Sequence, residues 1–591
     1  MNLMEQHYMK ILKMCGNLTG QDQEHPVTVQ RLAEELCCTP RNVKFILRKL
    51  EETDYIRWKA GKGRGCTSRI TLLRGLDELV EGQFRAYLQD GKVREAVELM
   101  LNPALSPFLQ DKLRNMLDRE FGLQTLEQDA AGPEILRITY NRQLNIMDPA
   151  RVFTAIETSL LGQLCNTLIV YDSATRGFLS SLSHTWEYQE EDQSWVFYLR
   201  KDVHFHHGRT LAAEDVVFTF NRLRGHHSPA LWQFADVECV EARGRWTVIF
   251  YLRRPNTFFL HSVASVHMSI LPVGTNLNEH PVIGTGPFRI AEQTEHLIVL
   301  EAFSDHFRER PLLDRVELLF VPNERSNVRN YSLPQTNTPV AEEQQASSEL
   351  DYAVTGCRYL LFNMTRKGIQ QQHPFREAMR ILYNQHALIR ELRGNRLLAA
   401  SSLLPEKSRI LPIPDRPLDE IAPLLNKAGY TGEALSLYFL PKKDETDEAH
   451  WLQQRCASVG VELTLHPIHR IDPLMFRKEA DMILAEEVLE TDVEWGLINF
   501  YLNPENYLNL LLQDEQKKTV SALLGGFSEM HSEEREERID QLEHRVRQEY
   551  WLLHGCHVNK KSRLHPSLRG LQVESFGFVD ISKIWIKPSS V

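Results

Sequence analysis

The sequence has no uninterrupted apolar run of the roughly 20 residues that a membrane helix requires, because charges and prolines break its most apolar stretches. Its opening residues, MNLMEQHYMKILKMCGN, lack the basic stretch, apolar run and small-residue cleavage site of a signal peptide. The nine cysteines are scattered and include no C-x-x-C pair, which argues against a disulfide framework or a zinc site. We therefore expect a cytoplasmic protein that has no membrane partner.

The sequence also lacks the motifs of common catalytic sites. It contains no G-x-S-x-G, no S-x-x-K with its partner motifs and no recognisable kinase set. The glycine-rich string GKGRG at 61–65 does not have the G-x-x-x-x-G-K-[ST] spacing of a phosphate-binding loop, and no helix is expected directly after it. We expect neither enzyme activity nor a cofactor.

The charge of the chain is divided unevenly along its 591 residues, a length that predicts at least two separately packed cores. Residues 1–74 carry 13 lysines and arginines against 8 acidic residues, a net charge of +5. The remainder carries 55 against 71, a net charge of −16. A basic domain attracts phosphates whereas an acidic one is repelled by them, so only the N-terminal part is expected to contact nucleic acid.

Residues 28–50 have the pattern of two short helices joined by a tight turn. Thr28 is a suitable N-cap for an amphipathic helix through Leu36, and after the turn CCTP a second helix begins at Thr39-Pro40. In the second helix, apolar residues at 43, 46, 47 and 50 share one face. The residues left outside that face are basic, amide or aromatic: Arg41, Asn42, Lys44, Phe45, Arg48 and Lys49.

The segment 55–73, YIRWKAGKGRGCTSRITLL, predicts two strands around a basic glycine-rich hairpin. Together with the helix pair it predicts an α+β winged helix-turn-helix in 1–75, with its second helix in the major groove of double-stranded DNA. Arg41 and Asn42 are best suited to reading bases, because arginine pairs with guanine and asparagine with adenine. The wing residues that we expect at phosphates are Lys62, Arg64 and Arg69. The alternative for each residue is a solvated surface position.

Residues 76–134 have helical periodicity, which predicts a helical connector, and from Ile135 strands alternate with helices. Four later segments resemble, in order, the motifs of the extracytoplasmic solute-binding proteins that deliver peptides and related ligands to transporters. These segments are NRQLNIMDPA (141–150), LRKDVHFHHGRTLAAEDVVFTFNRL (199–223), PVIGTGPFRI (281–290) and YLLFNMTRKGIQQQHPFREAMRIL (359–382).

The resemblance implies that residues 135–591 form a two-lobed α/β module of the type II periplasmic-binding-protein kind, which closes on a ligand by a hinge motion. Lobe I would comprise about 135–345 and 550–591, and lobe II about 346–549. In the same resemblance, the segment WGLINFYLNPENYLNLL (495–511) lines the ligand cleft. Trp495, Asn499 and Tyr501 are candidate cleft residues because aromatic and amide groups suit sugar-like ligands, and Asn363 is a further candidate. Packing in the core is the alternative for each.

The same segment bears on the charge of the ligand. Aligning Asn503-Pro504 with the acidic-Pro pair of the family puts Phe500 where peptide binders carry an aspartate for the ligand's amino group. Because a buried ammonium without a carboxylate partner is costly to desolvate, we expect a ligand other than a free-amine peptide.

A cluster of histidines, His204, His206, His207, His226 and His227, raises the hypothesis of a metal site. No group of cysteines or carboxylates lies nearby to complete such a site, so we expect no bound metal. The resemblance instead places a histidine before a turn to glycine, where it satisfies backbone groups. Gly284, Thr285 and Gly286 are expected to be structural, because small residues permit close packing of the strand.

The combination of a winged helix with this module resembles the SgrR family, regulators of the response to accumulated sugar phosphate. This resemblance implies that the protein is a DNA-binding transcription regulator that senses a small molecule, either a sugar phosphate or another metabolite. The alternative is a solute- or oligopeptide-binding protein of a transport system, with an N-terminal interaction module. A homodimer is an arrangement that the sequence allows, because a single winged helix usually needs a second copy to gain sufficient affinity for DNA.

Overall fold

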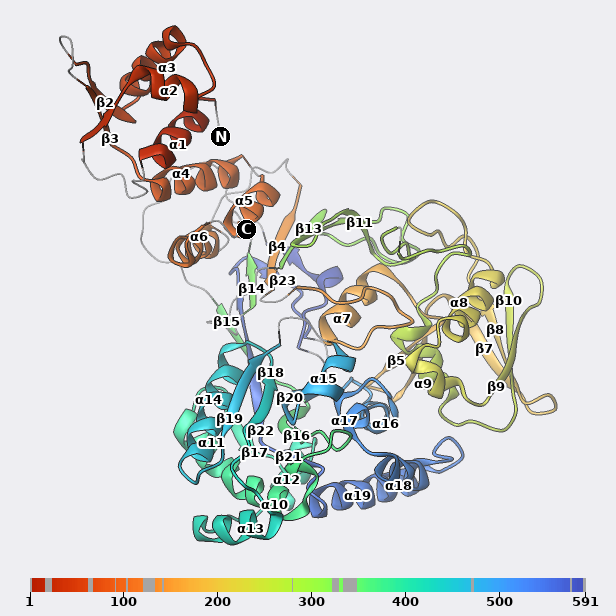
Figure 1. Cartoon of the computed structure of the whole chain (residues 1–591). Helices are drawn as coiled ribbons and strands as arrows, with labels where there is room; N and C mark the ends of the chain where they lie inside the picture. Colours follow the sequence, from red (N-terminus) through yellow and green to blue (C-terminus); the bar gives the residue numbers. More distant parts are fainter. Residues whose placement is uncertain are drawn as a thin grey trace. The chain divides into compact units, whose positions relative to one another are not determined.

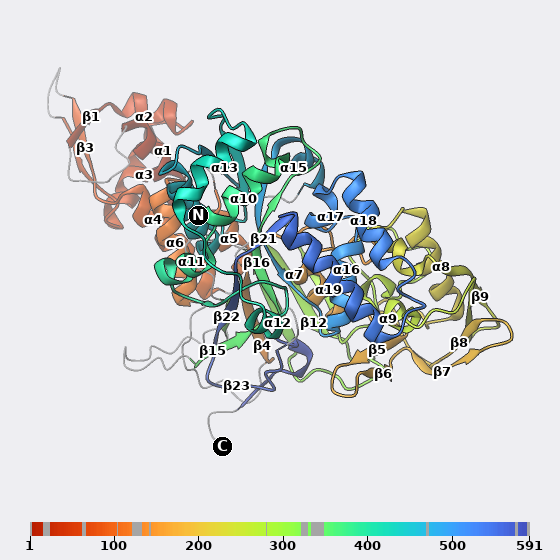
Figure 2. The same ribbon diagram turned by 90° about the horizontal axis from the view of Figure 1, so that it is seen from below.

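The computed structural model describes residues 3–587 except 16–23, 62–66, 91, 103–104, 121–132, 141–142, 279, 321–328, 333–347, 469–471 and 574–576. The chain divides into two compact units. Among the described residues, one unit contains those between 3 and 120, and the other contains those between 133 and 587. Figure 1 shows the elements of both units, and Figure 2 shows them from below.

The first unit begins with a winged helix-turn-helix, as predicted. Its helices are α1 (Leu3–Cys15), α2 (Val29–Glu35) and α3 (Pro40–Glu52), and its antiparallel sheet has the order β1 (Glu24–Val27), β3 (Ser68–Leu72), β2 (Ile56–Lys59). The Thr28 hydroxyl accepts the Arg31 N–H at 3.2 Å, and the Thr39 hydroxyl accepts the Asn42 N–H at 3.3 Å. Both predicted N-caps therefore start the helices where the sequence places them.

The N-terminal unit contains more than the predicted winged helix. Helix α1 contributes the buried residues Tyr8, Ile11 and Leu12 to the same core as α2 and α3. Helices α4 (Leu76–Gln89), α5 (Val93–Met100) and α6 (Pro107–Glu120) follow, and Leu79 of α4 packs against that core. The predicted connector is thus helical, but it belongs to one compact unit with the winged helix because apolar side chains join them.

The second unit contains two lobes, and the first lobe is built on two sheets. The larger sheet has the order β11 (Phe288–Gln293), β12 (Leu297–Ala302), β13 (Arg315–Phe320), β4 (Ile135–Tyr140), β14 (Arg329–Ser332), β22 (Cys556–Leu564), β15 (Ser348–Ala353), and β17 (Arg396–Ala399) also pairs with β22. The smaller sheet has the order β7 (Ser183–Gln189), β8 (Ser194–Leu199), β10 (Thr247–Leu252), β9 (Val237–Ala242). Helices α7 (Ala155–Leu164), α8 (Ala213–Gly225) and α9 (Phe259–Ala264) pack on these sheets.

The second lobe has a five-stranded sheet with apolar residues on both faces. Its order is β19 (Leu463–Pro467), β18 (Leu435–Phe439), β20 (Met482–Val488), β16 (Gly356–Phe362), β21 (Leu552–His554). One face is covered by α10 (His373–Leu382), α11 (Gln385–Leu392), α13 (Ile421–Ala428) and α14 (Lys443–Ala457). The other is covered by α15 (Pro473–Glu479), α16 (Val493–Leu502), α17 (Tyr507–Leu511), α18 (Asp514–Leu524) and α19 (Ser532–Gln548) (Figure 1). Because both faces are buried, the central strands have continuous apolar runs, Tyr359–Phe362 in β16 and Met482–Ala485 in β20.

The chain passes between the two lobes at two places. It leaves the larger sheet after β15 and enters the five-stranded sheet at β16, and it returns after β21 along β22. At Gly356, with φ of 143°, a Cβ atom would lie 2.0 Å from the Glu487 carbonyl oxygen, so the first crossing is tightly packed. The crossings lie near 355 and 555, somewhat later than the expected lobe limits at 345 and 550. Within the described part of the chain, no helix has both the length and the apolar character for crossing a lipid bilayer.

Candidate functional site

The outer face of α3 is the first candidate site. Val43, Ile46, Leu47 and Leu50 are buried in the core of the winged helix. The six residues predicted to face DNA are all exposed: Arg41, Asn42, Lys44, Phe45, Arg48 and Lys49. Phe45 is 55% exposed, so a large apolar ring stands among basic and amide groups where it could contact a thymine methyl group.

The basic residues on this face differ in their contacts. Arg48 and Lys49 both bind the Glu52 carboxylate, at 2.9 and 3.0 Å. These hydrogen bonds, that from Lys49 first, hold the pKa of Glu52 below its usual value. No ion pair is found for Arg41 or Lys44 among the described residues. The cations in the N-terminal half of α3 are therefore more available to an external phosphate than Arg48 and Lys49 in the C-terminal half.

The hairpin between β2 and β3 contains the predicted wing residues. Arg69 binds the Glu24 carboxylate of β1 at 2.9 Å, and Lys59 contacts the same carboxylate. Arg69 would therefore have to leave or share this partner to contact a phosphate. Lys62 and Arg64 lie outside the described residues.

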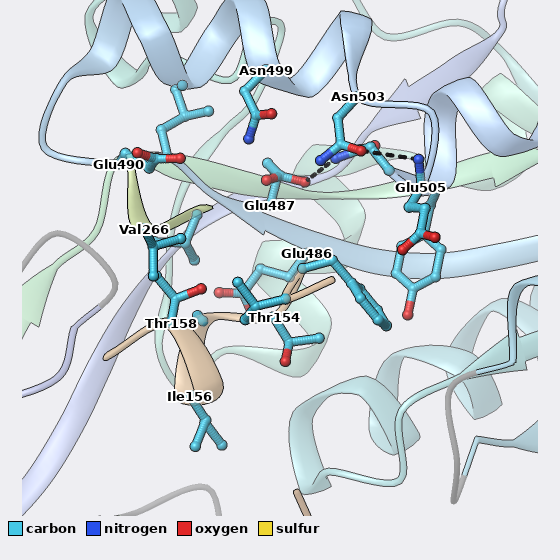
Figure 3. Close-up of a pocket in the computed structure, with 18 of the residues that line it drawn as sticks. Thr154, Ile156, Thr158, Val266, Glu486, Glu487, Glu490, Asn499, Asn503 and Glu505 are labelled. Carbon is cyan, nitrogen blue, oxygen red and sulfur yellow. Dashed lines mark hydrogen bonds between the residues drawn. The ribbon is translucent and has the colours of Figure 1, made fainter. Parts of the chain in front are cut away.

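The second candidate site is a cavity of about 260 Å³ between the two lobes. The first lobe contributes the N-terminal turn of α7 and its flanks, together with Val266 and His267. The second lobe contributes the end of β20, the loop that follows it, and one face of α16. Figure 3 shows Glu487, Glu490 and Asn499 on one side of this space, with Thr154, Thr158 and Val266 on the other.

Helix α16 presents a narrow polar face to the cavity. Gly496 and Asn499 of the helix line the cavity together with Asn503, the residue just past its end, at the three- and four-residue spacing of one helical face. A Cβ atom on Gly496 would lie 3.2 Å from the Glu490 backbone nitrogen, so glycine lets the helix approach the loop that carries Glu490. Asn499 is the one predicted cleft residue that the structure places at the cavity.

The other three predicted cleft residues lie in the protein core and not on the cavity wall. Trp495 is 2% exposed and stacks on Trp232 of the first lobe, with ring centroids 5.4 Å apart. Tyr501 is also 2% exposed and packs edge-on against Phe500. Asn363 is completely buried, and its amide nitrogen donates to three backbone carbonyls, those of Phe476, Arg477 and Ala480. Their contacts fit the core alternative.

The cavity is rich in carboxylates, which the sequence analysis did not anticipate. Four glutamates line it against two lysines: Glu486, Glu487, Glu490 and Glu505 against Lys442 and Lys560. The expectation of a non-amine ligand depended on a missing carboxylate at 500. Position 500 is indeed phenylalanine, but acidic side chains reach the cavity from β20 and its following loop, so the missing carboxylate at 500 does not argue against an amine ligand.

Two of these carboxyls have strongly raised pKa values. Burial raises the pKa of Glu487 to about 7, although a hydrogen bond from the Asn506 amide opposes the change. Burial, with the nearby charges of Asp492 and Glu487, raises the pKa of Glu490 to about 7. Burial acts in the same direction on Glu486, but the cations of Lys560 and Arg358 outweigh it and hold its pKa low.

The two lobes also contact each other away from the cavity. The Thr257 N–H donates to the Ser528 carbonyl at 2.8 Å, and the Ser528 hydroxyl donates to Asp236 at 3.0 Å. The Arg535 guanidinium lies 4.1 Å above the ring of Phe258. Hydrogen bonds and stacked rings thus hold the lobes together in this arrangement.

The predicted structural motifs of the first lobe are found in close contact with each other. His206 donates from Nε2 to the Gly286 carbonyl at 3.1 Å and accepts the Gly284 N–H on Nδ1 at 3.2 Å. Burial lowers the pKa of His206 to about 4, so the ring is neutral. No three His, Cys, Asp or Glu side chains in the described ranges are grouped as ligands for a metal ion.

Two family models match the chain. The model described as "Sugar transport-related sRNA regulator N-term" matches residues 3–124. The model described as "Bacterial extracellular solute-binding proteins, family 5 Middle" matches residues 180–518, more than half of the chain. These ranges correspond to the N-terminal unit and to most of the two-lobed module.

Similar proteins cover the whole length of the chain. An uncharacterized protein of Bacillus subtilis strain 168, YhjP, is 31% identical over 598 residues, covering 99% of this chain and all of that protein. The HTH-type transcriptional regulator SgrR of Yersinia enterocolitica is 25% identical over 593 residues, covering 98% of each. The SgrR of an Escherichia coli O6 strain is 28% identical over 374 residues, covering 62% of this chain and 63% of that protein.

Solved structures share the fold of the module. The oligopeptide-binding protein AppA of B. subtilis, solved with a nonapeptide, has a TM-score of 0.63 at 18% identity, covering 77% of this chain and all of AppA. NikA of Staphylococcus aureus, solved with Ni(L-His)2, has the same TM-score at 16% identity. The chain therefore belongs to the SgrR family, and it combines that family's N-terminal domain with a module of the family 5 bacterial extracellular solute-binding proteins.

Proposed function

We propose that the protein is a cytoplasmic transcription regulator that binds double-stranded DNA through α3 and the wing, and that a small metabolite in the interlobe cavity changes its affinity for the operator. The observation that carries the proposal is the outer face of α3, where Arg41, Asn42 and Lys44 are exposed on a capped helix of a winged fold. This is the placement of base- and phosphate-contacting residues in a recognition helix.

The two-lobed module provides the means of sensing. A ligand shifts an equilibrium between two states only if it binds them with different affinity. The cavity is lined by both lobes, so a ligand in it makes its full set of contacts only when the lobes are closed. We infer that lobe closure is the step that ligand binding favours.

The resemblance to sugar-phosphate regulators points to a sugar phosphate as the ligand, but the charge of the cavity opposes it. A phosphate dianion would enter a space with four glutamates and two lysines. Because like charges in a poorly solvated space repel strongly, we do not carry the sugar phosphate into the proposal. We do include a homodimer in the proposal, because two winged helices on adjacent half-sites of the DNA bind more tightly than one.

The DNA-binding part is tested by the affinity of the full chain for duplex DNA from its own promoter, measured by fluorescence anisotropy at fixed salt. The Arg41→Ala and Asn42→Ala variants should each weaken specific binding about tenfold or more, as expected for a lost base contact. Arg94→Ala on α5, which removes an exposed arginine paired with Glu98, serves as the control. Unchanged affinity in both α3 variants would refute this role and favour the transport alternative.

The sensing part is tested in the same assay with a panel of metabolites. At least one should change the affinity of the wild-type chain for the operator. DNA binding that persists and responds to none of them would remove sensing from the proposal while leaving DNA binding intact.

A further inference from the structure

The cavity between the lobes offers an excess of hydrogen-bond acceptors. The Oδ1 atom of Asn499 is buried and has no hydrogen-bond partner among the residues that the structure describes. Within the described ranges, the Glu490 carboxylate accepts no hydrogen bond and joins no ion pair. In the same part of the chain, Glu487 accepts one hydrogen bond, from the Asn506 amide at 3.2 Å, and forms no ion pair with a lysine or arginine. Asn499, Glu490 and Glu487 therefore have acceptor oxygens on one wall of the cavity that a ligand with hydrogen-bond donors could use (Figure 3).

The two lysines at the cavity already have carboxylate partners. Lys560 contacts Glu486, which also lies 3.6 Å from the buried guanidinium of Arg358. Lys442 lies 3.5 Å from Glu445. An anion that entered the cavity would have to take these lysines from their partners, which is costly in a buried site.

The N-terminal turn of α7 also reaches the cavity, and a helix N-terminus by itself favours an anion. Its first turn, however, contains the buried carboxylate of Glu157. That carboxylate accepts the Asn145 N–H at 2.6 Å and the Thr154 hydroxyl. The partial positive charge at the N-terminus of α7 is therefore already balanced by the carboxylate of Glu157.

We propose that the ligand of this cavity is a small organic cation, an amine or a guanidinium, which donates hydrogen bonds to Glu487, Glu490 and Asn499. The proposal rests on the proposed function in taking the interlobe cavity as the sensing site. An organic cation is favoured over a metal ion, because the cavity carboxylates are not grouped as metal ligands in the described part of the chain. Three spread acceptors instead match a ligand with several N–H donors.

A cation bound in this position should also cause Glu487 and Glu490 to release protons to the solvent. Glu487 and Glu490, each with a pKa of about 7, are partly protonated at neutral pH. A cation favours their ionised forms, so binding releases protons and its affinity rises with pH until about pH 7, then levels off. The charged or titratable groups that face them are Glu486, Lys560, Lys442, Asp492, Glu505, Tyr507, His267 and Tyr140.

The test is isothermal titration calorimetry on the full chain with four probes: agmatine, 1,4-diaminobutane, glucose 6-phosphate and glucose. At least one of the two cations should bind, and its affinity should rise between pH 5.5 and 7 by up to about tenfold per pH unit for each proton that is released. Titrations in buffers of different ionisation enthalpy should show proton release at pH 7. Glucose 6-phosphate should bind more weakly than that cation.

Substitutions locate the binding to the cavity. Glu487→Gln and Glu490→Gln keep the size of the side chain, and each should weaken cation binding about tenfold or more, the usual loss for one charge-assisted hydrogen bond. Glu533→Gln, an exposed residue of α19, is the matched control and should leave binding unchanged. Circular dichroism and thermal melting of each variant show that the fold is retained.

Several outcomes would overturn the proposal. These are no binding of either cation, cation binding that both cavity variants leave unchanged, or tighter binding of glucose 6-phosphate. The outcome is separate from that of the proposed function, since a cation can bind the cavity without changing operator affinity. In that case the ligand class stands and the sensing proposal fails.

Discussion

At the scale of single residues, Glu490 faces opposite demands from folding and from ligand binding. Its pKa is raised to about 7 by burial, so ionisation is easier in the unfolded chain than in the folded one. A carboxyl of this kind makes the protein without ligand less stable as pH rises from about 4.5 to about 7, and the loss then stays constant. A residue that costs stability in this way is a candidate for function.

The first prediction follows from the direction in which ionisation of Glu490 changes the stability of the fold. Glu490→Gln removes the ionisable group, so at pH 8 the ligand-free variant should be more stable than wild type, on the order of 1 kcal/mol. At pH 4.5 the two proteins should have nearly equal stability. Urea unfolding at both pH values measures the difference, and a variant that is less stable at pH 8 would contradict the account.

Gly284 illustrates a residue whose small size is required by packing. A Cβ atom there would lie 2.1 Å from the Leu164 carbonyl oxygen and 2.6 Å from the Cys165 sulfur. The segment after Pro281 is thus pressed against the end of α7, whose other end lines the cavity. The sequence analysis predicts a structural glycine here, and the contacts agree.

We predict that Gly284→Ala lowers the free energy of unfolding by about 1–3 kcal/mol, the usual cost of overpacking. The matched control is Gly162→Ala on α7, where a Cβ atom would meet nothing within 4 Å. That exposed helical position should gain about 0.5–1 kcal/mol, because alanine restricts the unfolded chain. Thermal melting separates the two, and equal effects would be inconsistent with the packing described.

At the scale of elements, α16 shows what the sequence could and could not predict. The segment from Trp495 to Tyr501 is apolar all round, which is typical of a buried helix. A polar residue in such a helix stands out, and Asn499 could be predicted on that ground. Trp495 and Tyr501 could not be assigned correctly by residue type alone, because aromatic rings suit a core as well as a sugar site.

Other parts of the fold were missed although the sequence contained signals for them. Tyr8, Ile11 and Leu12 are spaced for one helical face, a signal of α1 that the sequence analysis does not use, since it tests this stretch only for the features of a signal peptide and finds none. Glu486, Glu487 and Glu490 follow the apolar run of β20. Polar groups just past the carboxyl end of a buried strand are common at ligand crevices of α/β sheets. What the sequence could not show is which loops of the other lobe face them.

Helix α3 yields a prediction that separates base reading from phosphate contact. Asn42→Ala should reduce the discrimination between operator and unrelated duplex, by about 1–3 kcal/mol. Lys44→Ala should weaken binding to both duplexes similarly and reduce the salt slope by about 1. Anisotropy titrations at several salt concentrations measure both. Identical effects of the two substitutions on discrimination would show that these residues do not divide the roles in this way.

The stack of Trp232 on Trp495 joins the two lobes outside the cavity, so it should stabilise the arrangement in which both lobes line the cavity. Trp232→Leu keeps an apolar side chain but loses the ring contact, worth about 1 kcal/mol. Ligand affinity should fall by about fivefold, and the radius of gyration in X-ray scattering should rise. Trp246→Leu, which packs in the core of its own lobe, is the control. A loss of ligand affinity in both variants alike would argue against a specific role of the stack.

At the scale of the whole molecule, the uneven distribution of charge matches the functions proposed for the two parts, DNA binding for the N-terminal part and ligand binding for the rest. The first 74 residues have a net charge of +5, and the rest of the chain has −16. The charge of the basic part suits the proposed binding to DNA, and four glutamates against two lysines in the cavity suit the proposed cation. The charge asymmetry and the order of the domains could be predicted from the sequence. The character of the cavity could not, because it depends on side chains from distant segments.

The most direct test of ligand-controlled DNA binding is one titration of the full chain against fluorescent promoter duplex, at fixed salt, with and without a saturating cavity ligand. The account predicts specific binding in both conditions with dissociation constants that differ at least about fivefold, the lower range of allosteric coupling. Glu490→Gln should bind DNA normally without ligand, and it should need about tenfold more ligand than the wild type to reach the same difference. Equal dissociation constants at saturating ligand, or no specific binding at all, would contradict it.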